Sequence, residues 1–396
     1  MSNDTQPEIR FPGFTEDWEQ RKLGDEFEKV NERNDGSFGK DKWISVAKMY
    51  FQDPEKVQSN NIDTRTYVMR LGDIAFEGHP NADFKFGRFV VNDIGEGVVS
   101  ELFPIYRHKQ EYDNNYWKYA IQLERIMAPI FAKSITSSGN SSNKLYPKHF
   151  LRQRVSVASI DEQHKIGDFL LTIDRTIALH QRKLDLLKET KKGFLQKMFP
   201  KNGAKVPEIR FPGFTKDWEE RKLGDVFSER SERSSEGELI SVTINSGVIK
   251  ASELDRKDNS SDNKSNYKKV EVGDIAYNSM RMWQGASGYS SYEGILSPAY
   301  TVIIPKEGTD SKFFAYDFKR YDMIQTFKRN SQGLTSDTWN LKFPTLKLVK
   351  IMVPSIEEQK QIAAFFERLD NTIALHEREL DVLKETKKGF LQKMFV

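Results

Sequence analysis

Apolar residues recur at every third or fourth position along two stretches of the chain, about 160–199 and 356–396. This spacing is the a/d pattern of a coiled coil, and at about 1.5 Å per residue it predicts two helices of roughly 58 Å. The first seam consists of Ile166, Leu170, Ile173, Ile177, His180, Leu184, Leu187, Lys191, Phe194 and Met198. The second consists of Ile362, Phe366, Leu369, Ile373, His376, Leu380, Leu383, Lys387, Phe390 and Met394.

Each apolar seam needs a covering surface. We expect the helices to begin near Ser159 and Ser355, because serine is a good N-cap and acids follow in the first turn. Two matching seams in one chain favour intramolecular, antiparallel pairing; the alternative is that each seam pairs with another protein. His180 and His376 are polar seam positions, and the sequence suggests no carboxylate or second histidine beside them. We interpret them as residues that set the register, not as metal ligands or catalysts.

The segments before the two helices, about 26–159 and 226–355, have a different pattern. Alternating, β-branched runs at 87–91, 98–106 and 299–305 predict strands bounded by Gly, Asn and Asp turns. Shorter helical patterns lie at about 114–134 and 311–327. Each segment is therefore expected to be a mixed α/β globule.

The frame around these segments is repeated almost unchanged. Pro7–Asp25 returns as Pro207–Asp225 with two differences, and Thr176–Phe199 returns as Thr372–Phe395 with three. The segments between share only short echoes, such as Gly72-Asp73-Ile74-Ala75 and Gly273-Asp274-Ile275-Ala276. This pattern predicts a tandem duplication whose two modules share one structural role and differ in what they bind. The expected limits are 1–159 and 200–355 for the α/β domains, and 160–199 and 356–396 for the helices.

Composition and motifs restrict the function. The chain has 396 residues, a formal net charge of +3 and no cysteine, so disulfides, thiolate metal sites and cysteine nucleophiles are excluded. There is no secretory signal pattern and no apolar run of membrane-spanning length, which favours the cytoplasm. Phosphate-binding loops, dinucleotide fingerprints and zinc-ligand spacings do not occur. We therefore expect no catalytic residues, no metal and no cofactor in this chain.

Polar loops in both variable segments are suited to nucleic acid. Amides can pair with adenine, Arg and Lys with guanine, and hydroxyl groups with phosphate. The candidate DNA-binding residues of the first segment are Lys85, Arg88, Asn140, Asn143, Lys144 and Tyr146. Those of the second are Arg281, Trp283, Gln284, Ser331, Gln332, Ser336, Thr338 and Trp339. For any single residue, an ordinary solvated loop explains the pattern equally well.

The whole arrangement resembles the specificity subunit of a type I restriction–modification system. The resemblance lies in the doubled FPGF-T-x-D-W-E-x-R-K-L-G-D motif, the doubled S-I-D/E-E-Q helix starts and the T-I-A-L-H…K-E-T-K-K-G-F-L-Q-K-M-F helices. It implies a pseudo-two-fold protein in which two target-recognition domains each read half of a bipartite site in double-stranded DNA. It also implies antiparallel helices that set the spacing and dock two modification subunits.

By the same resemblance the chain is non-catalytic. Methylation with S-adenosylmethionine, and ATP- and Mg-dependent translocation and cleavage, would belong to the modification and restriction subunits. The competing hypotheses are a coiled-coil scaffold without DNA specificity and a solitary enzyme with an unfamiliar site.

Overall fold

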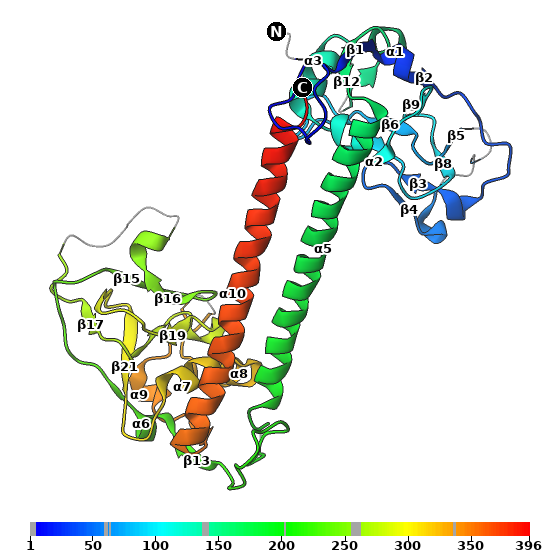
Figure 1. The fold of residues 1–396 in the computed structure, drawn as a ribbon. Coiled ribbons are helices and arrows are strands. Elements are labelled where there is room, and N and C mark those ends of the chain that lie inside the picture. Colours follow the sequence, from blue (N-terminus) through cyan, green and yellow to red (C-terminus); the bar gives the residue numbers. More distant parts are fainter. Residues whose placement is uncertain are drawn as a thin grey trace. The chain divides into compact units, whose positions relative to one another are not determined.

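The computed structural model describes residues 5–58, 62, 65–136, 142–201, 203–254, 263–335 and 338–396. The chain forms two compact units (Figure 1). Unit 1 comprises Met1–Gln181 with Glu379–Val396, and unit 2 comprises Arg182–Arg378. The two long helices, α5 (Ile160–Lys197) and α10 (Ile356–Lys393), each contribute one half to each unit. Both helices begin directly after the serines expected from the sequence.

Unit 1 is built around an antiparallel sheet with the order β2 (Phe27–Lys29), β9 (Ile105–His108), β6 (Ile74–Glu77) and β7 (Arg88–Val91). Antiparallel strand pairs accompany it: β1 (Glu19–Lys22) with β12 (Arg154–Val157), β3 (Ile44–Ser45) with β4 (Tyr50–Phe51), β5 (Thr66–Met69) with β8 (Gly97–Ser100), and β10 (Ile135–Thr136) with β11 (Lys144–Leu145). Its helices are α1 (Leu23–Glu26), α2 (Asn114–Ala120), α3 (Glu124–Ala132) and α4 (Pro147–Phe150), with 3-10 turns η1 (Lys40–Lys42) and η2 (Pro54–Lys56).

The central sheet of unit 1 is covered on both faces. Side chains alternate along a strand, so Ile74 and Phe76 of β6 point to one face while Ala75 points to the other. The first face packs on the aromatic core around Trp117 of α2 and Phe131 of α3. The second face packs on the smaller strand pairs. Double coverage explains why the central strands are almost continuously apolar.

Unit 2 repeats this plan. Its sheet has the order β14 (Phe227–Glu229), β21 (Tyr300–Pro305), β18 (Ile275–Asn278) and β19 (Ser287–Tyr289). The strand pairs are β13 (Glu219–Lys222) with β22 (Lys350–Val353), β15 (Ile240–Thr243) with β16 (Gly247–Lys250), and β17 (Lys268–Val270) with β20 (Gly294–Leu296). Its helices are α6 (Leu223–Val226), α7 (Ser311–Asp317), α8 (Tyr321–Asn330) and α9 (Phe343–Leu346), with η3 (Ala251–Glu253) and η4 (Met282–Gln284).

The two variable segments therefore share one fold, although their sequences differ. The sheet orders β2-β9-β6-β7 and β14-β21-β18-β19 correspond strand by strand. A fold needs a buried apolar pattern of the right period, and many different residues supply one. The variable segments thus keep one scaffold and change the side chains that it displays.

Three expected elements are divided in the structure. The run 98–106 forms two strands, β8 and β9, because the chain turns at Ser100–Phe103 and Pro104 offers no N–H to continue a ladder. The helical pattern at 114–134 forms α2 and α3, and that at 311–327 forms α7 and α8. Each break is a tight turn closed by backbone bonds over three residues, such as Gln122 N–H to Tyr119 O.

The halves of α5 and α10 pack antiparallel within each unit. In unit 1 the start of α5 meets the end of α10, with the rings of Phe169 and Phe390 4.8 Å apart and Lys387 paired to Asp174 at 2.6 Å. In unit 2 the equivalent contacts are made by the end of α5 and the start of α10. Phe194 lies 5.1 Å from Phe365, and Lys191 pairs with Asp370 at 2.5 Å. Antiparallel pairing within the chain is confirmed.

The seam of the helices is covered, as the spacing predicted. All the seam residues singled out from the sequence are buried or half-buried; among them Leu184 is 4% exposed and Leu380 3%. Apolar residues off the seam behave differently: Leu186 is 67% exposed and Val382 63%. No helix in the described part of the chain is long and apolar enough to cross a membrane.

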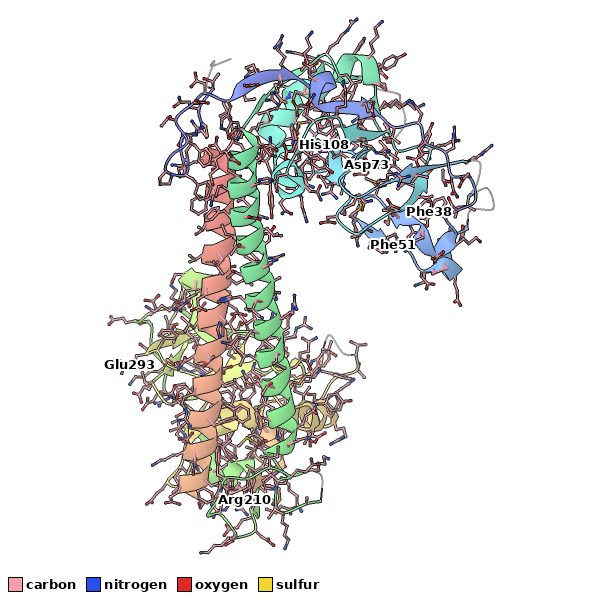
Figure 2. The ribbon with its side chains drawn as sticks, turned by 45° about the vertical axis from the view of Figure 1, so that its right-hand side comes forward. Phe38, Phe51, Asp73, His108, Arg210 and Glu293 are labelled. Atoms are coloured by element: carbon pink, nitrogen blue, oxygen red, sulfur yellow. The ribbon has the colours of Figure 1, made fainter. Side chains whose placement is uncertain are left out.

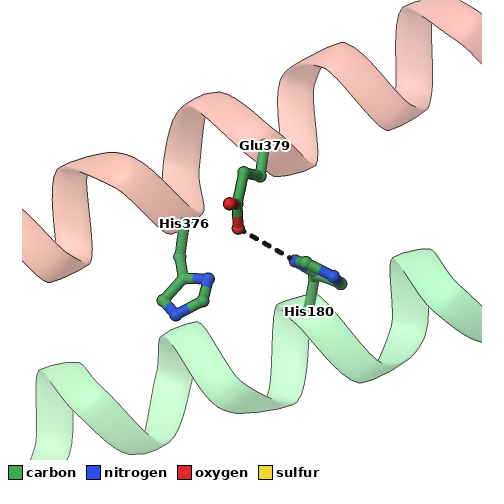
Figure 3. Close-up of side chains that lie close together, drawn as sticks. All are labelled: His180, His376 and Glu379. Atoms are coloured by element: carbon green, nitrogen blue, oxygen red, sulfur yellow. Dashed lines mark ion pairs between the residues drawn. The ribbon is translucent and has the colours of Figure 1, made fainter.

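Two of the three differences between the helix repeats place a carboxylate beside a basic side chain of the other helix. Glu377 and Glu379 of α10 stand where α5 has Gln181 and Lys183. Glu377 pairs with Lys188 at 2.7 Å in unit 2, and Glu379 lies 3.5 Å from Nδ1 of His180 in unit 1 (Figure 3). The expectation that His180 has neither a carboxylate nor a second histidine beside it is therefore wrong, since His376 also lies near it (Figure 3). The carboxylate was missed because it comes from the other helix.

The FPGF motif fastens each helix start. The Arg10 guanidinium forms two hydrogen bonds with Glu162 in the first turn of α5, and Arg210 does the same with Glu358 of α10. These carboxylates are buried, and their hydrogen bonds raise the pKa of Arg10 and Arg210. The repeated motif is thus structural: it holds the α/β core of each unit onto its helices.

Candidate nucleic-acid interface

The two polar loops predicted in the second segment lie together in unit 2. The backbone N–H of Leu341 donates to the carbonyl oxygen of Ser279 at 2.8 Å, which joins the chain after α8 to the loop after β18. Next to this bond the rings of Trp283 and Trp339 meet edge to face, 5.2 Å apart. Lys328 lies 5.6 Å from the Trp339 ring centroid. One loop pair therefore carries aromatic, basic and amide groups side by side.

The equivalent loops of unit 1 are joined by the same kind of bond. The backbone N–H of Asn143 donates to the carbonyl oxygen of Gly78 at 2.8 Å, and its side-chain amide donates to Phe86 O at 3.2 Å. Gly78 is needed here, because a Cβ atom at this position would lie 2.2 Å from the Asn143 oxygen. Gly78 follows β6 and Ser279 follows β18, which are equivalent strands. The two units thus display a loop pair at the same place in the fold.

Several predicted contact residues present their side chains to solvent. Lys85, Lys144 and Tyr146 are exposed in unit 1, as are Arg281 and Gln332 in unit 2. Trp283, Gln284 and Trp339 are half-buried, so that one edge of each remains accessible. Asn140 and Ser336 lie outside the described residues.

Other predicted residues hold the loops in shape. Arg88 donates to the carbonyl oxygen of Ala47 at 2.6 Å and lies over the Phe84 ring. The Ser331 hydroxyl donates to Phe327 O, and the Thr338 hydroxyl donates to Thr335 O. With Asn143, these residues are committed to contacts within the protein. Composition alone did not separate them from the exposed group, because both groups have the same residue types.

A pocket of about 370 Å³ beside the unit 2 loops was not foreseen from the sequence. It lies between the β15–β16 hairpin and the loop after β18, and its polar lining includes Thr243, Asn278, Arg281, Gln284 and Tyr300. The only signal of the hairpin was the short echo Ile44-Ser45-Val46 and Ile240-Ser241-Val242. That echo marks β3 and β15, which begin equivalent hairpins.

The Gly-Asp-Ile-Ala echo has a structural explanation. Asp73 (Figure 2) accepts two hydrogen bonds from Arg107 on β9, at 2.8 Å each, and Asp274 accepts two from Arg230, which follows β14. The hydrogen bonds to these aspartates raise the pKa of both arginines. In each unit an arginine thus binds the equivalent aspartate. The arginine comes from β9 in unit 1 and from the segment after β14 in unit 2.

His108 is half-buried, and both of its ring nitrogens are enclosed by the protein. Its ring stacks on Tyr112 at 3.7 Å, and burial lowers its pKa to about 3. It stays neutral at physiological pH and is shielded from solvent, which makes it unsuitable as a general base.

The exposed Arg281 should matter for base discrimination. We expect Arg281→Ala to lose about 1–3 kcal/mol of discrimination at one base pair, because arginine reads guanine through paired hydrogen bonds. The matched control is Ser331→Ala, since that hydroxyl is bound to Phe327 O. Competition binding with singly substituted DNA sites measures the effect. Equal loss on all sequences would instead make Arg281 a phosphate contact.

Comparison with known proteins agrees with this architecture. A family profile described as "Type I restriction modification DNA specificity domain" matches residues 215–385. The chain is 22% identical to the type I restriction enzyme MjaVIII specificity subunit of Methanocaldococcus jannaschii, over 95% of this chain and 91% of the relative. It is 23% identical to the putative MjaX specificity subunit of the same organism, over 95% and 92%. The chain is thus similar to type I specificity subunits over almost its whole length, and residues 215–385 match their DNA specificity domain.

Solved specificity subunits share the fold. The HsdS subunit of Thermoanaerobacter tengcongensis aligns over 98% of this chain and 97% of its own, with a TM-score of 0.51 and 15% identity. The S subunit from M. genitalium aligns over 99% of both chains, with a TM-score of 0.55 and 13% identity. The predicted fold class, mixed α/β domains with two long helices, is confirmed.

Proposed function

We propose that each unit of this specificity subunit reads one half of a bipartite site in double-stranded DNA. The main support is that both units have a pair of loops at the same place in the fold. In each pair a backbone hydrogen bond joins the two loops, to Gly78 O in unit 1 and to Ser279 O in unit 2. The scaffold is common and the displayed side chains differ. Two different half-sites are the expected result, because base contacts specify sequence.

The chain itself acts without catalysis, metal or cofactor in this proposal. Its partners are DNA and two modification subunits, with restriction subunits joining through the complex in the cytoplasm. Methyl transfer from S-adenosylmethionine, and the ATP- and Mg-dependent steps, belong to those partners. The exposed residues Leu179 and Leu186 on α5, and Leu375 and Val382 on α10, are repeat-equivalent apolar positions that suit two like partners.

Methylome sequencing tests the proposal. Cells that contain the modification subunits should methylate a bipartite motif only when this chain is also present. A scaffold without DNA specificity would leave the motif unchanged when the chain is removed. A gel shift of the complex on that motif should weaken steeply with salt, as phosphate contacts require.

We further propose that α5 and α10 set the gap between the half-sites. Each helix is continuous over 38 residues, about 57 Å at 1.5 Å per residue, and contributes to both units. Half-sites read from one face of DNA lie about 34 Å apart, or a multiple of that distance. A packed helix pair, unlike a flexible linker, holds one such distance.

An insertion in the helix tests this role. Four residues added near Thr190 should change the gap between the half-sites, or abolish binding because the seam loses its register. The bases read within each half should stay the same. The methylated motif of the insertion variant gives the result, and an unchanged gap would show that the helices do not set the spacing.

A further inference from the structure

A half-buried lysine in unit 2 connects two surface segments. Lys319 lies in the turn between α7 and α8, and its Nζ donates to the carbonyl oxygens of Ile244 at 2.8 Å and Gly285 at 2.5 Å. Ile244 belongs to the turn of the β15–β16 hairpin. Gly285 ends η4, in the loop that carries Arg281, Trp283 and Gln284. One ammonium group therefore ties the hairpin turn to the predicted recognition loop.

The residues of that hairpin turn are available for contact. Ile244, Asn245 and Ser246 are exposed, and the turn is closed by the Thr243 hydroxyl, which accepts from the N–H of Ser246 at 2.9 Å. The turn borders the pocket that Arg281 and Gln284 also line. Asn245 thus offers a side-chain amide, which can pair with adenine in the major groove, close to an arginine that can pair with guanine.

In the described part of the chain, the carboxylates of the cleft beside Lys319 are bound by other side chains. The cleft at its side contains Lys191, Tyr289, Lys312, Tyr316, Glu367 and Asp370. Asp370 is bound by Lys191 and by the Tyr316 hydroxyl, and Glu367 is bound by Lys312. Burial, with the nearby Lys191, lowers the pKa of Lys319 to about 8.

This environment costs stability at neutral pH. The ordinary lysine pKa is near 10.4, so the unfolded chain holds this proton more tightly than the folded one. The cost of the buried charge is present below about pH 8 and disappears as the pH rises towards 10.4. Unit 1 has Gln122 at the equivalent place and folds without such a group. Lys319 is therefore not required by the scaffold.

We infer that Lys319 is a positioning residue that makes the hairpin turn Ile244–Ser246 a third recognition segment of unit 2, with Asn245 contacting a base edge. The inference rests on the proposed reading of DNA by unit 2. It also explains why two segments distant in sequence share the Lys319 ammonium as a hydrogen-bond donor. In unit 1 the hairpin turn is held differently, by Arg88 on Ala47 O.

The test uses the full chain with its modification subunits and records methylation of every singly substituted site. Lys319→Met and Asn245→Ala should each relax discrimination by about tenfold or more at the same base pair of the second half-site. The first half-site should be unaffected. Lys319→Arg, which keeps donors for both carbonyl groups, should retain most of the discrimination. Lys306→Met is the matched control, because that lysine also binds a backbone carbonyl, Gly224 O, in the frame of unit 2.

The outcomes separate this inference from the proposed function. A methylation pattern left unchanged by Lys319→Met and Asn245→Ala would overturn it, and so would equal losses at both half-sites. Suppose that these two substitutions had no effect but exchange of the whole segment 226–355 still changed the second half-site. Unit 2 would then read DNA without using the hairpin turn. If that exchange also had no effect, the proposed function itself would fail.

Discussion

Exchanging residues 26–159 for the corresponding segment of a relative with a similar frame should replace one half of the methylated motif and leave the other half unchanged. The exchanged segment contains the loops around Gly78 and Asn143 but none of unit 2. The junctions lie in the repeated frame, where the FPGF motif and the Arg10–Glu162 pair are preserved. We expect a complete switch of the first half-site, since base contacts specify sequence.

Methylome sequencing of cells carrying the exchanged chain gives the answer directly. The reciprocal exchange of 226–355 is the control and should replace only the second half. A change in both halves, or in the wrong half, would contradict independent reading by the two units.

Placing a charge in the helix seam should have the largest effect on stability. Leu184→Asp and Leu380→Asp each put a carboxylate at a position less than 5% exposed. The lost apolar packing and the buried charge should together lower the free energy of unfolding by about 3–5 kcal/mol. Thermal and urea unfolding of the purified chain measure this loss.

The same helices provide matched controls. Leu186→Asp and Val382→Asp make the same chemical change at positions that are 67% and 63% exposed, two residues further along each helix. These variants should unfold nearly like the wild type. If all four variants behaved alike, the seam would not be the buried face. If the control variants stayed stable but lost the modification subunits, the exposed Leu186 and Val382 would be assigned to that interface.

The repeated helices show how small sequence differences can fix an arrangement. The two helices differ in that α10 has Glu377 and Glu379 where α5 has Gln181 and Lys183. The two glutamates pair with Lys188 and His180 across the helices. Such half-exposed ion pairs contribute little to stability, but they disfavour other registers.

Sequence reasoning was accurate where the signal is local. The heptad seam predicted both long helices to within a few residues, because helix periodicity depends on neighbours three and four positions away. It failed at the breaks between α2 and α3 and between β8 and β9, where a turn interrupts an apolar run. The structure brings the candidate loops of each unit together, and their contact with DNA stays a prediction. The sequence did not show which of their residues are exposed and which are bound within the protein. Arg88 and Arg281 have the same side chain, and only the structure shows that Arg88 binds Ala47 O.

By itself, the sequence determined the duplication, the helix seam, the absence of cysteine chemistry and the family resemblance. These features are carried by local spacing and by residue identity. The tertiary structure alone decided that the dissimilar variable segments share one sheet order, that the loop pairs meet at Gly78 and Ser279, and that Lys319 binds a hairpin turn. Those contacts are backbone hydrogen bonds and buried carbonyl groups between distant segments. Almost any residue can supply a backbone N–H or carbonyl group, so the partners in these contacts leave little trace in the order of the amino acids.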